Sequence, residues 1–331
     1  MTVCFTLLVS FAIAQETIDL PTDYADLKEP VSFAQLEAVI RYASQKDYVK
    51  TSIEGTTVEG RPLYLVRLSK TDEPRWKVLF IGTQHGNEPA GKDAIAYLLW
   101  DLAENPDKLP DDVAVYLFPN INPDGTEKNK RRNGNEADLN RDHLFLFQPE
   151  TQTLHKTTER IRPHLVVDCH EFTRDSSDYD NLGYDEWPLI MMGTANNPFF
   201  PNTVFETGLE WIERAEPHMN EAGHNYHRYY VGGVPPYDEQ RYSTLEPDDA
   251  RNGLATYGGL GFIIEAGIKR SAPNPNADLA QRVDAYTILL RRFIEDSAMI
   301  DRSLKALERA QAEEVYDFVP VNYFWGKGAR D

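Results

Sequence analysis

Short continuous runs of hydrophobic residues alternate along this chain with segments in which hydrophobic residues recur at helical spacing. The continuous runs lie at 77–83, 113–118, 165–169 and 262–264, and such runs are typical of strands buried on both faces. Segments with helical spacing, such as 151–161 and 203–222, separate some of these runs. This alternation predicts an α/β fold in which a mixed, mostly parallel twisted sheet carries helices on both faces.

Further helices are predicted near both ends of the chain. Ser32 is placed to cap a helix that begins at Phe33, and Pro89 opens another helix directly after the first buried strand. A helical pattern also extends from Leu279 to about Glu314. The stretch 172–202 has no clear periodicity, so we expect a long loop there.

The first residues have the character of a targeting segment. Val3 to Ala14 is apolar and uncharged, and Ala12-Ile13-Ala14 resembles a cleavage site. We therefore predict that residues 1–14 are a signal peptide and that the protein is secreted or periplasmic. No later stretch is long and apolar enough for stable membrane insertion. Removal of Cys4 would leave Cys169 as the single cysteine, so we expect no internal disulfide.

The chain has 331 residues and a formal net charge of −19. A surface of this charge repels phosphate backbones, which excludes nucleic acid as a natural partner. The charge otherwise indicates solvated acidic faces, and the sequence does not indicate an oligomeric state.

Imidazole and carboxylate groups stand where the predicted strands end. His85 and Glu88 follow the first buried strand, His170 follows the third, and Glu265 follows the strand near 262–264. Ligands bind at the carboxyl ends of the strands in open α/β sheets, so these groups converge on one edge. Two histidines and one carboxylate are a ligand set of catalytic zinc that leaves a position for water. The sequence therefore predicts one Zn²⁺ ion per chain, held by His85, Glu88 and His170.

Five short motifs carry a family resemblance. In chain order they are HGNE, PNINPDG, DLNRD, VVDCHE and FIIEAG. This combination resembles the zinc carboxypeptidase family, the carboxypeptidase A-like metallopeptidases, over roughly residues 32–300. The resemblance implies that His85, Glu88 and His170 are the metal ligands and that Glu265 is the general base.

The resemblance also implies substrate contacts. Asn140 and Arg141 match the pair that holds a terminal carboxylate, and Arg131 matches the arginine that polarises the scissile carbonyl, although Arg132 is adjacent. Tyr242 is the preferred counterpart of the family's substrate tyrosine, with Tyr257 as the other candidate. Aromatic residues in 172–202 and 224–242 are expected to shape the pocket. The segment 119–125 is interpreted as turn structure without a catalytic group.

Two departures leave the substrate open. His170 follows Glu88 by only 82 positions, and Asp142 follows Arg141 where the family more often has asparagine. We expect a zinc metallocarboxypeptidase that hydrolyses a C-terminal peptide bond. The alternative is a zinc amidohydrolase, either a deacylase of a small N-acyl amino acid or an amidase of cell-wall peptides. On either interpretation residues 15–300 form the catalytic domain. Residues 301–331 form a helical and aromatic tail, for which the sequence leaves two interpretations: the last strand of this domain or the start of a second one.

Overall fold

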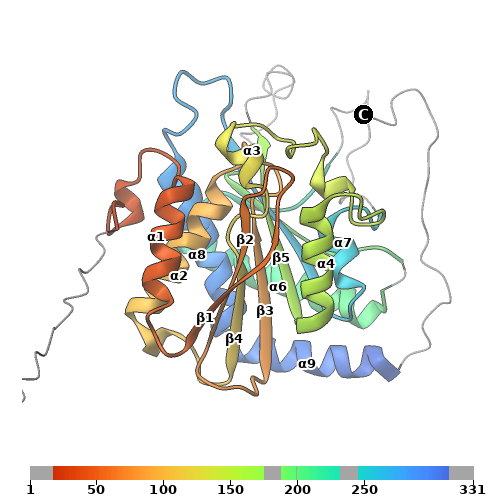
Figure 1. Ribbon diagram of the computed structural model, residues 1–331. Helices are drawn as coiled ribbons and strands as arrows, with labels where there is room; N and C mark the ends of the chain where they lie inside the picture. Colours follow the sequence, from red (N-terminus) through yellow and green to blue (C-terminus); the bar gives the residue numbers. More distant parts are fainter. Residues whose placement is uncertain (1–17, 175–187, 199, 232–244, 313–331) are drawn as a thin grey trace, which may run out of the picture.

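The computed structural model describes residues 18–174, 188–198, 200–231 and 245–312. The predicted signal peptide, the end of the tail and Tyr242 lie outside these residues. Within them, an eight-stranded sheet has the order β1-β2-β4-β3-β5-β8-β6-β7 (Figure 1). The pairs β3–β4, β3–β5, β5–β8 and β6–β7 are parallel, and β1–β2, β2–β4 and β6–β8 are antiparallel. The predicted mixed, mostly parallel sheet is confirmed.

The four apolar runs form β3, β4, β5 and β8, and the sheet has four further strands among the described residues. Their bounds are β1 Val49–Thr56, β2 Pro62–Ser69, β3 Trp76–Gly82, β4 Val113–Phe118, β5 Leu165–Thr173, β6 Ile190–Thr194, β7 Tyr226–Arg228 and β8 Leu260–Ile268. Strand β6 lies inside the stretch 172–202, so the prediction of one long loop there is wrong. Every residue of β6 is buried because the strand pairs with β8 in the sheet interior.

Helices cover both faces of the sheet. They are α1 Phe33–Ala43, α2 Ala90–Glu104, α3 Pro123–Glu127, α4 Pro149–Ile161, α6 Asn202–Glu221, α7 Ala250–Ala255, α8 Leu279–Glu295 and α9 Ser297–Ala312, with short 3₁₀ turns at Tyr24–Asp26, Pro106–Lys108 and Leu139–Arg141. One core cluster joins α1, α2, α6, α8 and α9 to the sheet, and a second joins α4 and α7 to its other face (Figure 1).

The starts and ends of these helices have local causes. Ser32 caps α1 and forms a reciprocal capping box with Gln35, as the sequence predicted. The helical pattern predicted from Leu279 to about Glu314 forms two helices, α8 and α9, which are divided at Asp296. Asp296 has a non-helical ψ of 84°, and its carboxylate accepts a hydrogen bond from Met299 N in the first turn of α9. Helix α9 therefore turns away and packs against α6.

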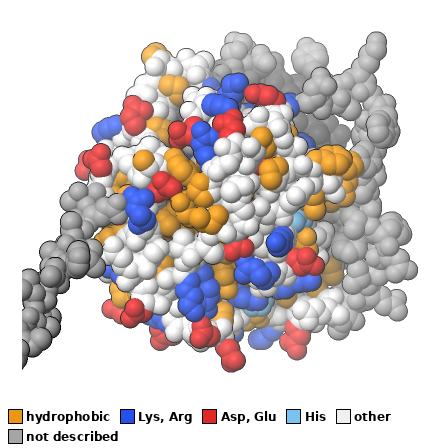
Figure 2. All heavy atoms as spheres, in the orientation of Figure 1, with side chains coloured by type: hydrophobic (Ala, Val, Ile, Leu, Met, Phe, Trp, Pro, Cys, Tyr) orange, Lys and Arg blue, Asp and Glu red, His pale blue; other side chains and the backbone are white. Residues whose placement is uncertain are grey.

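The surface carries charges of both signs. On the face shown in Figure 2, basic and acidic side chains are interspersed rather than gathered into one wide patch. No helix in the described part of the chain is long and apolar enough to cross a membrane. The excess of acid is thus spread over solvated faces, in agreement with its interpretation from the sequence.

Candidate metal centre and active site

The HGNE loop leaves β3 through a tight turn. Thr83 has a φ of 60°, in the left-handed region, which redirects the chain immediately before His85. Gly86 N donates a hydrogen bond to Arg131 O at 3.2 Å. A Cβ atom at Gly86 would collide with the backbone of Gly125, so the close approach of the two loops requires glycine at this position.

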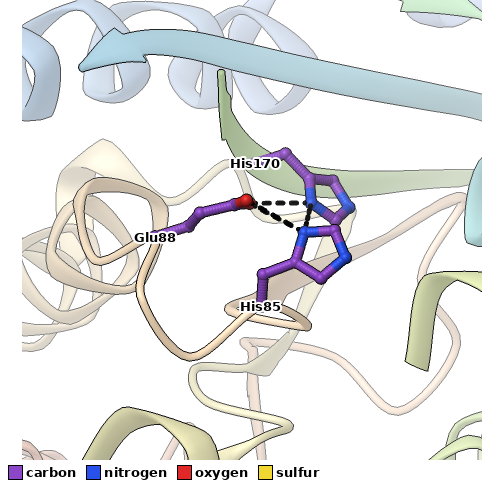
Figure 3. A group of neighbouring side chains, drawn as sticks. All are labelled: His85, Glu88 and His170. Carbon is purple, nitrogen blue, oxygen red and sulfur yellow. Dashed lines mark hydrogen bonds and ion pairs between the residues drawn. The ribbon is translucent and has the colours of Figure 1, made fainter. Parts of the chain in front are cut away.

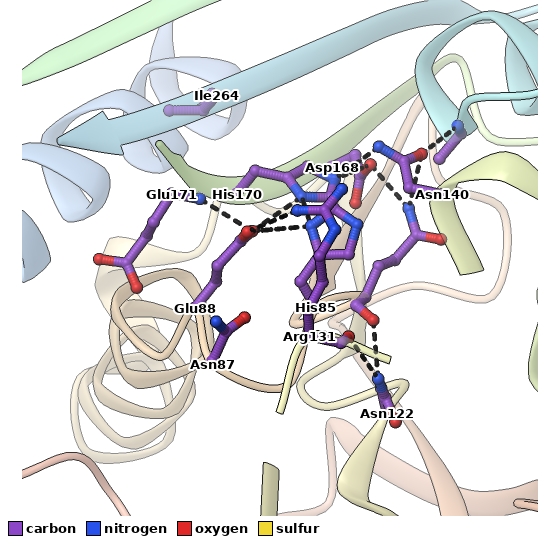
Figure 4. A network of polar contacts seen from close by, with 12 residues as sticks. His85, Asn87, Glu88, Asn122, Arg131, Asn140, Asp168, His170, Glu171 and Ile264 are labelled. Carbon is purple, nitrogen blue, oxygen red and sulfur yellow. Dashed lines mark hydrogen bonds and ion pairs between the residues drawn. The ribbon is translucent and has the colours of Figure 1, made fainter. Parts of the chain in front are cut away.

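The segment 119–125 forms hydrogen bonds to this loop. Asn122 caps α3 by accepting from Gly125 N, and its Nδ2 donates to Gln84 O at 2.9 Å and to Arg131 O at 3.3 Å (Figure 4). The segment therefore holds together the loop that carries His85 and the loop that carries Arg131, through its turn chemistry.

The side chains of His85, Glu88 and His170 meet at a single point. The two Nδ1 atoms lie 3.0 Å apart, and each lies 3.0 Å from an oxygen of Glu88 (Figure 3). All three residues are buried. Burial acts to raise the pKa of Glu88, but the neighbouring histidines hold the pKa of this carboxyl below its ordinary value.

This donor set fits a metal ion. Ligand atoms about 2.0–2.1 Å from a tetrahedral zinc ion are about 3.3 Å from one another, close to the spacing seen here. Two buried imidazole nitrogens and a carboxylate that face one another at this distance repel through their lone pairs unless a proton or a cation lies between them. This group is the one that could hold a metal ion among the described residues.

Two further carboxylates orient the imidazole rings. His170 Nε2 lies 2.5 Å from Asp168 Oδ2 (Figure 4), and His85 Nε2 lies 3.0 Å from Asp138 Oδ1. A ring that donates Nε2–H to a carboxylate keeps the Nδ1 lone pair for a metal. Although burial acts to lower the pKa of His170, Asp168 and Glu88 raise it well above its ordinary value. Asn140 Nδ2 lies 3.1 Å from the same Nε2, but Asp168 is the nearer group and can only accept.

Glu265 stands beside the cluster on the neighbouring strand. It is in register with His170 across β5 and β8 and is only partly exposed. Burial raises the pKa of Glu265 to about 7; the positive charge of His170 opposes this rise and the negative charge of Glu88 adds to it. A cavity of about 390 Å³ opens here, and its walls include His85, Glu88, Arg131, Arg141, Tyr229 and Glu265.

The structure distinguishes Arg131 from Arg132. Arg131 lines the cavity, with Nη1 at 3.3 Å from Glu88 Oε1 and Nη2 at 3.0 Å from Asp138 Oδ2. Arg132 instead donates to Glu136 O, within its own turn. Arg131 is therefore the arginine that faces the cluster.

Asn140 and Arg141 both line the cavity, but their side chains differ in burial: Asn140 is buried and Arg141 is exposed. Asn140 Oδ1 accepts from Ala250 N at 2.8 Å and from Gln84 Nε2 at 3.2 Å, so this amide oxygen already has two donors. Arg141 is exposed at the cavity wall, where Asp138 and Asp248 raise its pKa against the opposing effect of burial.

Asp142 does not act on Arg141 as a hydrogen-bond partner. Its carboxylate accepts from Phe147 N at 2.9 Å, Gln148 N at 2.8 Å and the Thr151 hydroxyl. These bonds hold the chain just before α4 and its first turn close to the turn at Asp142. The acid that replaces the family's usual asparagine therefore has structural partners of its own.

Other residues named from the sequence lie away from the cluster. His224 pairs with Asp284 at 2.7 Å, and His227 is exposed on β7. Cys169 points to the opposite face from His170 and packs in the core, as strand alternation predicted. Tyr242 lies outside the described residues, whereas Tyr229 lines the cavity.

A buried ion pair fixes the strand end that follows His170. Arg282 of α8 and Glu171 are both fully buried and pair directly, and Arg282 Nε also lies 3.1 Å from Asp278. Breaking a buried pair leaves a charge without compensation. We expect Arg282→Leu to lower the free energy of unfolding by about 3–5 kcal/mol in urea denaturation. Adding Glu171→Gln should recover part of this loss, and equal stability of the single and double variants would contradict the argument.

The fold and the cluster define an α/β protein with a candidate His-Glu-His metal centre of the hydrolase type. Residues 36–176 match the family model for zinc carboxypeptidase. Carboxypeptidase 2 of Trichophyton tonsurans is 36% identical over 109 residues, which are 32% of this chain and 20% of that protein. Carboxypeptidase SOL1 of Arabidopsis thaliana is 33% identical over 129 residues, 33% of this chain and 26% of that protein. These matches confirm the resemblance for this part of the chain.

Solved structures extend the likeness to most of the fold. A metallo-carboxypeptidase from Burkholderia cenocepacia superposes with a TM-score of 0.62 at 20% identity, covering 81% of this chain and 70% of that one. A metallo-carboxypeptidase from Pseudomonas aeruginosa superposes with a TM-score of 0.61 at 22% identity, covering 83% of this chain and 70% of that one. At this identity the likeness shows the fold alone.

The comparisons bear unequally on the candidate residues. The family match includes the positions of the His-Glu-His cluster and ends before Glu265. The matched part of the chain covers 20% of the length of the first matched relatives. The comparisons do not favour the alternative of a small-molecule amidohydrolase.

Proposed function

We propose that this chain is a zinc-dependent metallocarboxypeptidase that hydrolyses the C-terminal peptide bond of a peptide. The observation that carries this proposal is one cavity whose walls include two members of the His-Glu-His cluster, His85 and Glu88, together with a partly buried glutamate and an exposed arginine. These are the three requirements of an exopeptidase that uses water: a metal centre, a base and a receptor for the terminal carboxylate.

His85, Glu88 and His170 would hold one zinc ion, which would lower the pKa of a water molecule and polarise the scissile carbonyl. Glu265 accepts a proton from the attacking water, because its carboxyl group lines the cavity on the strand next to His170. The same carboxyl then donates the proton to the leaving amine. Arg131 donates hydrogen bonds to the oxygen on which negative charge develops.

Arg141 receives the terminal carboxylate of the substrate. Its planar guanidinium can form two parallel hydrogen bonds to a carboxylate, which a single ammonium group cannot match. Asn140 lies on the same wall, and Arg141 Nη1 donates to Asn140 O at 2.6 Å, which fixes the arginine relative to the cluster. Recognition of a free carboxylate restricts cleavage to the last peptide bond.

The test uses purified, zinc-loaded protein and a peptide library in free-acid and amidated forms, with products identified by mass spectrometry. We expect stepwise loss of C-terminal residues from the free acids only. Cleavage of amidated peptides at the same rate, or no peptide cleavage by protein with confirmed zinc content, would contradict the proposal.

A variant of the carboxylate receptor sharpens this test. Arg141→Ala should lower kcat/KM for free-acid peptides roughly 10- to 100-fold, mainly through KM, because a hydrogen-bonded charge pair is lost. Amidated peptides should be affected far less. The matched control is Arg160→Ala on α4, whose side chain pairs with Glu54. Equal losses on both peptide forms would assign Arg141 a structural role instead.

A further inference from the structure

A continuous series of hydrogen bonds runs behind the metal cluster, on the α4 and α7 side of the sheet. It begins at Asp168, the partner of the His170 ring, and none of its other members is a candidate ligand or base. The links are Gln84 Nε2 to Asp168 Oδ2 at 2.7 Å, Gln84 Oε1 to His143 Nε2 at 2.8 Å, His143 Nδ1 to His155 Nε2 at 3.0 Å and His155 Nδ1 to the Tyr257 hydroxyl at 3.0 Å.

One backbone group fixes the direction of these bonds. Ala250 N can only donate, so the atom of Asn140 that faces it at 2.8 Å is the amide oxygen. That oxygen also faces the Gln84 side chain, which must therefore present its nitrogen to Asn140 Oδ1 and to Asp168. Gln84 Oε1 then points the other way and accepts from His143 Nε2–H.

The direction continues through two neutral histidines. Both rings are buried, and this burial lowers the pKa of His143 well below its ordinary value and that of His155 to about 4. A neutral ring has one donor and one acceptor nitrogen. Because His143 donates through Nε2, its Nδ1 accepts from His155 Nε2–H, and His155 Nδ1 in turn accepts from the Tyr257 hydroxyl.

Asp168 depends on this series for its position. Its Oδ2 accepts hydrogen bonds from Gln84 Nε2 and His170 Nε2. Its Oδ1 is buried and has no hydrogen bond within the described part of the chain. Gln84 is thus the protein donor that holds the carboxylate in place beside His170. A rotation of Asp168 would turn the imidazole with it and alter the direction of the Nδ1 lone pair.

We propose that Tyr257, His155, His143 and Gln84 act as positioning residues, and that their one-way series of hydrogen bonds holds Asp168 against His170 and so sets the orientation of this ligand toward the metal. The inference rests on the proposed metal centre and goes beyond its ligands. It assigns a role to a histidine pair, His143 and His155, that the sequence motifs do not include in the site.

The first test measures zinc affinity by competition with a chromogenic chelator. We expect Gln84→Met to raise the dissociation constant for Zn²⁺ about 10- to 100-fold, and His143→Leu to raise it by about tenfold. His143→Gln keeps an amide donor for Gln84 Oε1 and should restore much of the affinity. The control is Thr158→Val in α4, because the Thr158 hydroxyl is buried, is close to His155 in sequence and has no hydrogen-bond partner among the described residues. Parental affinity in folded Gln84→Met and His143→Leu would overturn the proposal.

A second measurement does not depend on variants that fold. Nitrogen-15 spectra of the metal-free parent, labelled at histidine, should show both His143 and His155 neutral at pH 7 with the proton on Nε2. A proton on Nδ1 of either ring would break the series and overturn the proposal. A parent that binds Zn²⁺ but cleaves no peptide would refute the proposed function alone, whereas a parent that binds no Zn²⁺ would refute both.

Discussion

Replacement of Glu265 by glutamine is expected to leave zinc bound and to lower kcat by about 10²- to 10⁴-fold, the range attributed to general acid–base catalysis. The amide has nearly the shape of the carboxylate but cannot accept a proton from water. Glu265 lies next to the cluster without belonging to the three residues that meet at one point, so the metal site should survive. The measurements are kcat on a free-acid peptide and zinc content by atomic absorption.

The control for this variant is Glu150→Gln. Glu150 is also a buried glutamate, but its carboxylate accepts from Asn133 and Val58 N on the far side of α4 and does not line the cavity. We expect its turnover to stay near that of the parent. Parental turnover in Glu265→Gln, with a full complement of zinc, would show that another group is the base.

Removal of one metal ligand should have the second large effect. His170→Gln replaces a ring nitrogen that lies 3.0 Å from both His85 Nδ1 and Glu88 Oε2, so we expect loss of zinc and of detectable activity. A ligand that binds only the folded state stabilises it, by about 2.7 kcal/mol at 100 times the dissociation constant. A chelator should therefore lower the melting temperature of the parent and leave that of His170→Gln unchanged.

His224→Gln is the matched control for this experiment. His224 pairs with a carboxylate, Asp284, as His170 does with Asp168, but it lies outside the His-Glu-His cluster. Its variant should retain zinc, activity and the response to chelator. Retention of stoichiometric zinc by His170→Gln would exclude His170 as a ligand.

The sequence predicted the frame of this fold because buried strands and amphipathic helices have distinct periodicities. The run Val113–Phe118 is a strand with the predicted bounds, and Ser32 caps the predicted helix. One element was predicted incorrectly. Strand β6 includes most of the short apolar run 189–192, which the prediction of a long loop overlooked, and it pairs with β8. The division of the predicted helical pattern at Asp296 has a local signal, an acid before the first turn of a helix.

The candidate ligands could also be proposed from sequence, because parallel strands bring their carboxyl ends to one edge of a sheet. His85 and Glu88 follow β3, whereas His170 and Glu265 lie within β5 and β8, which extend beyond the apolar runs that predicted them. The choice between Arg131 and Arg132 required the folded turn, in which only Arg131 faces Glu88. The hydrogen bonds of Asp142 to Phe147 N and Gln148 N likewise depend on how the chain enters α4.

The sequence by itself determined the class of fold, the motif order and the residue types at the strand ends, since these follow from periodicity and from short spacings. The tertiary structure decided what surrounds the metal cluster. Asp168 and Tyr257 are separated by 89 positions in the chain, yet Gln84, His143 and His155 join them through hydrogen bonds. Hydrogen bonds require contact within about 3 Å, and contacts between such distant segments exist only once the sheet and α4 have packed together.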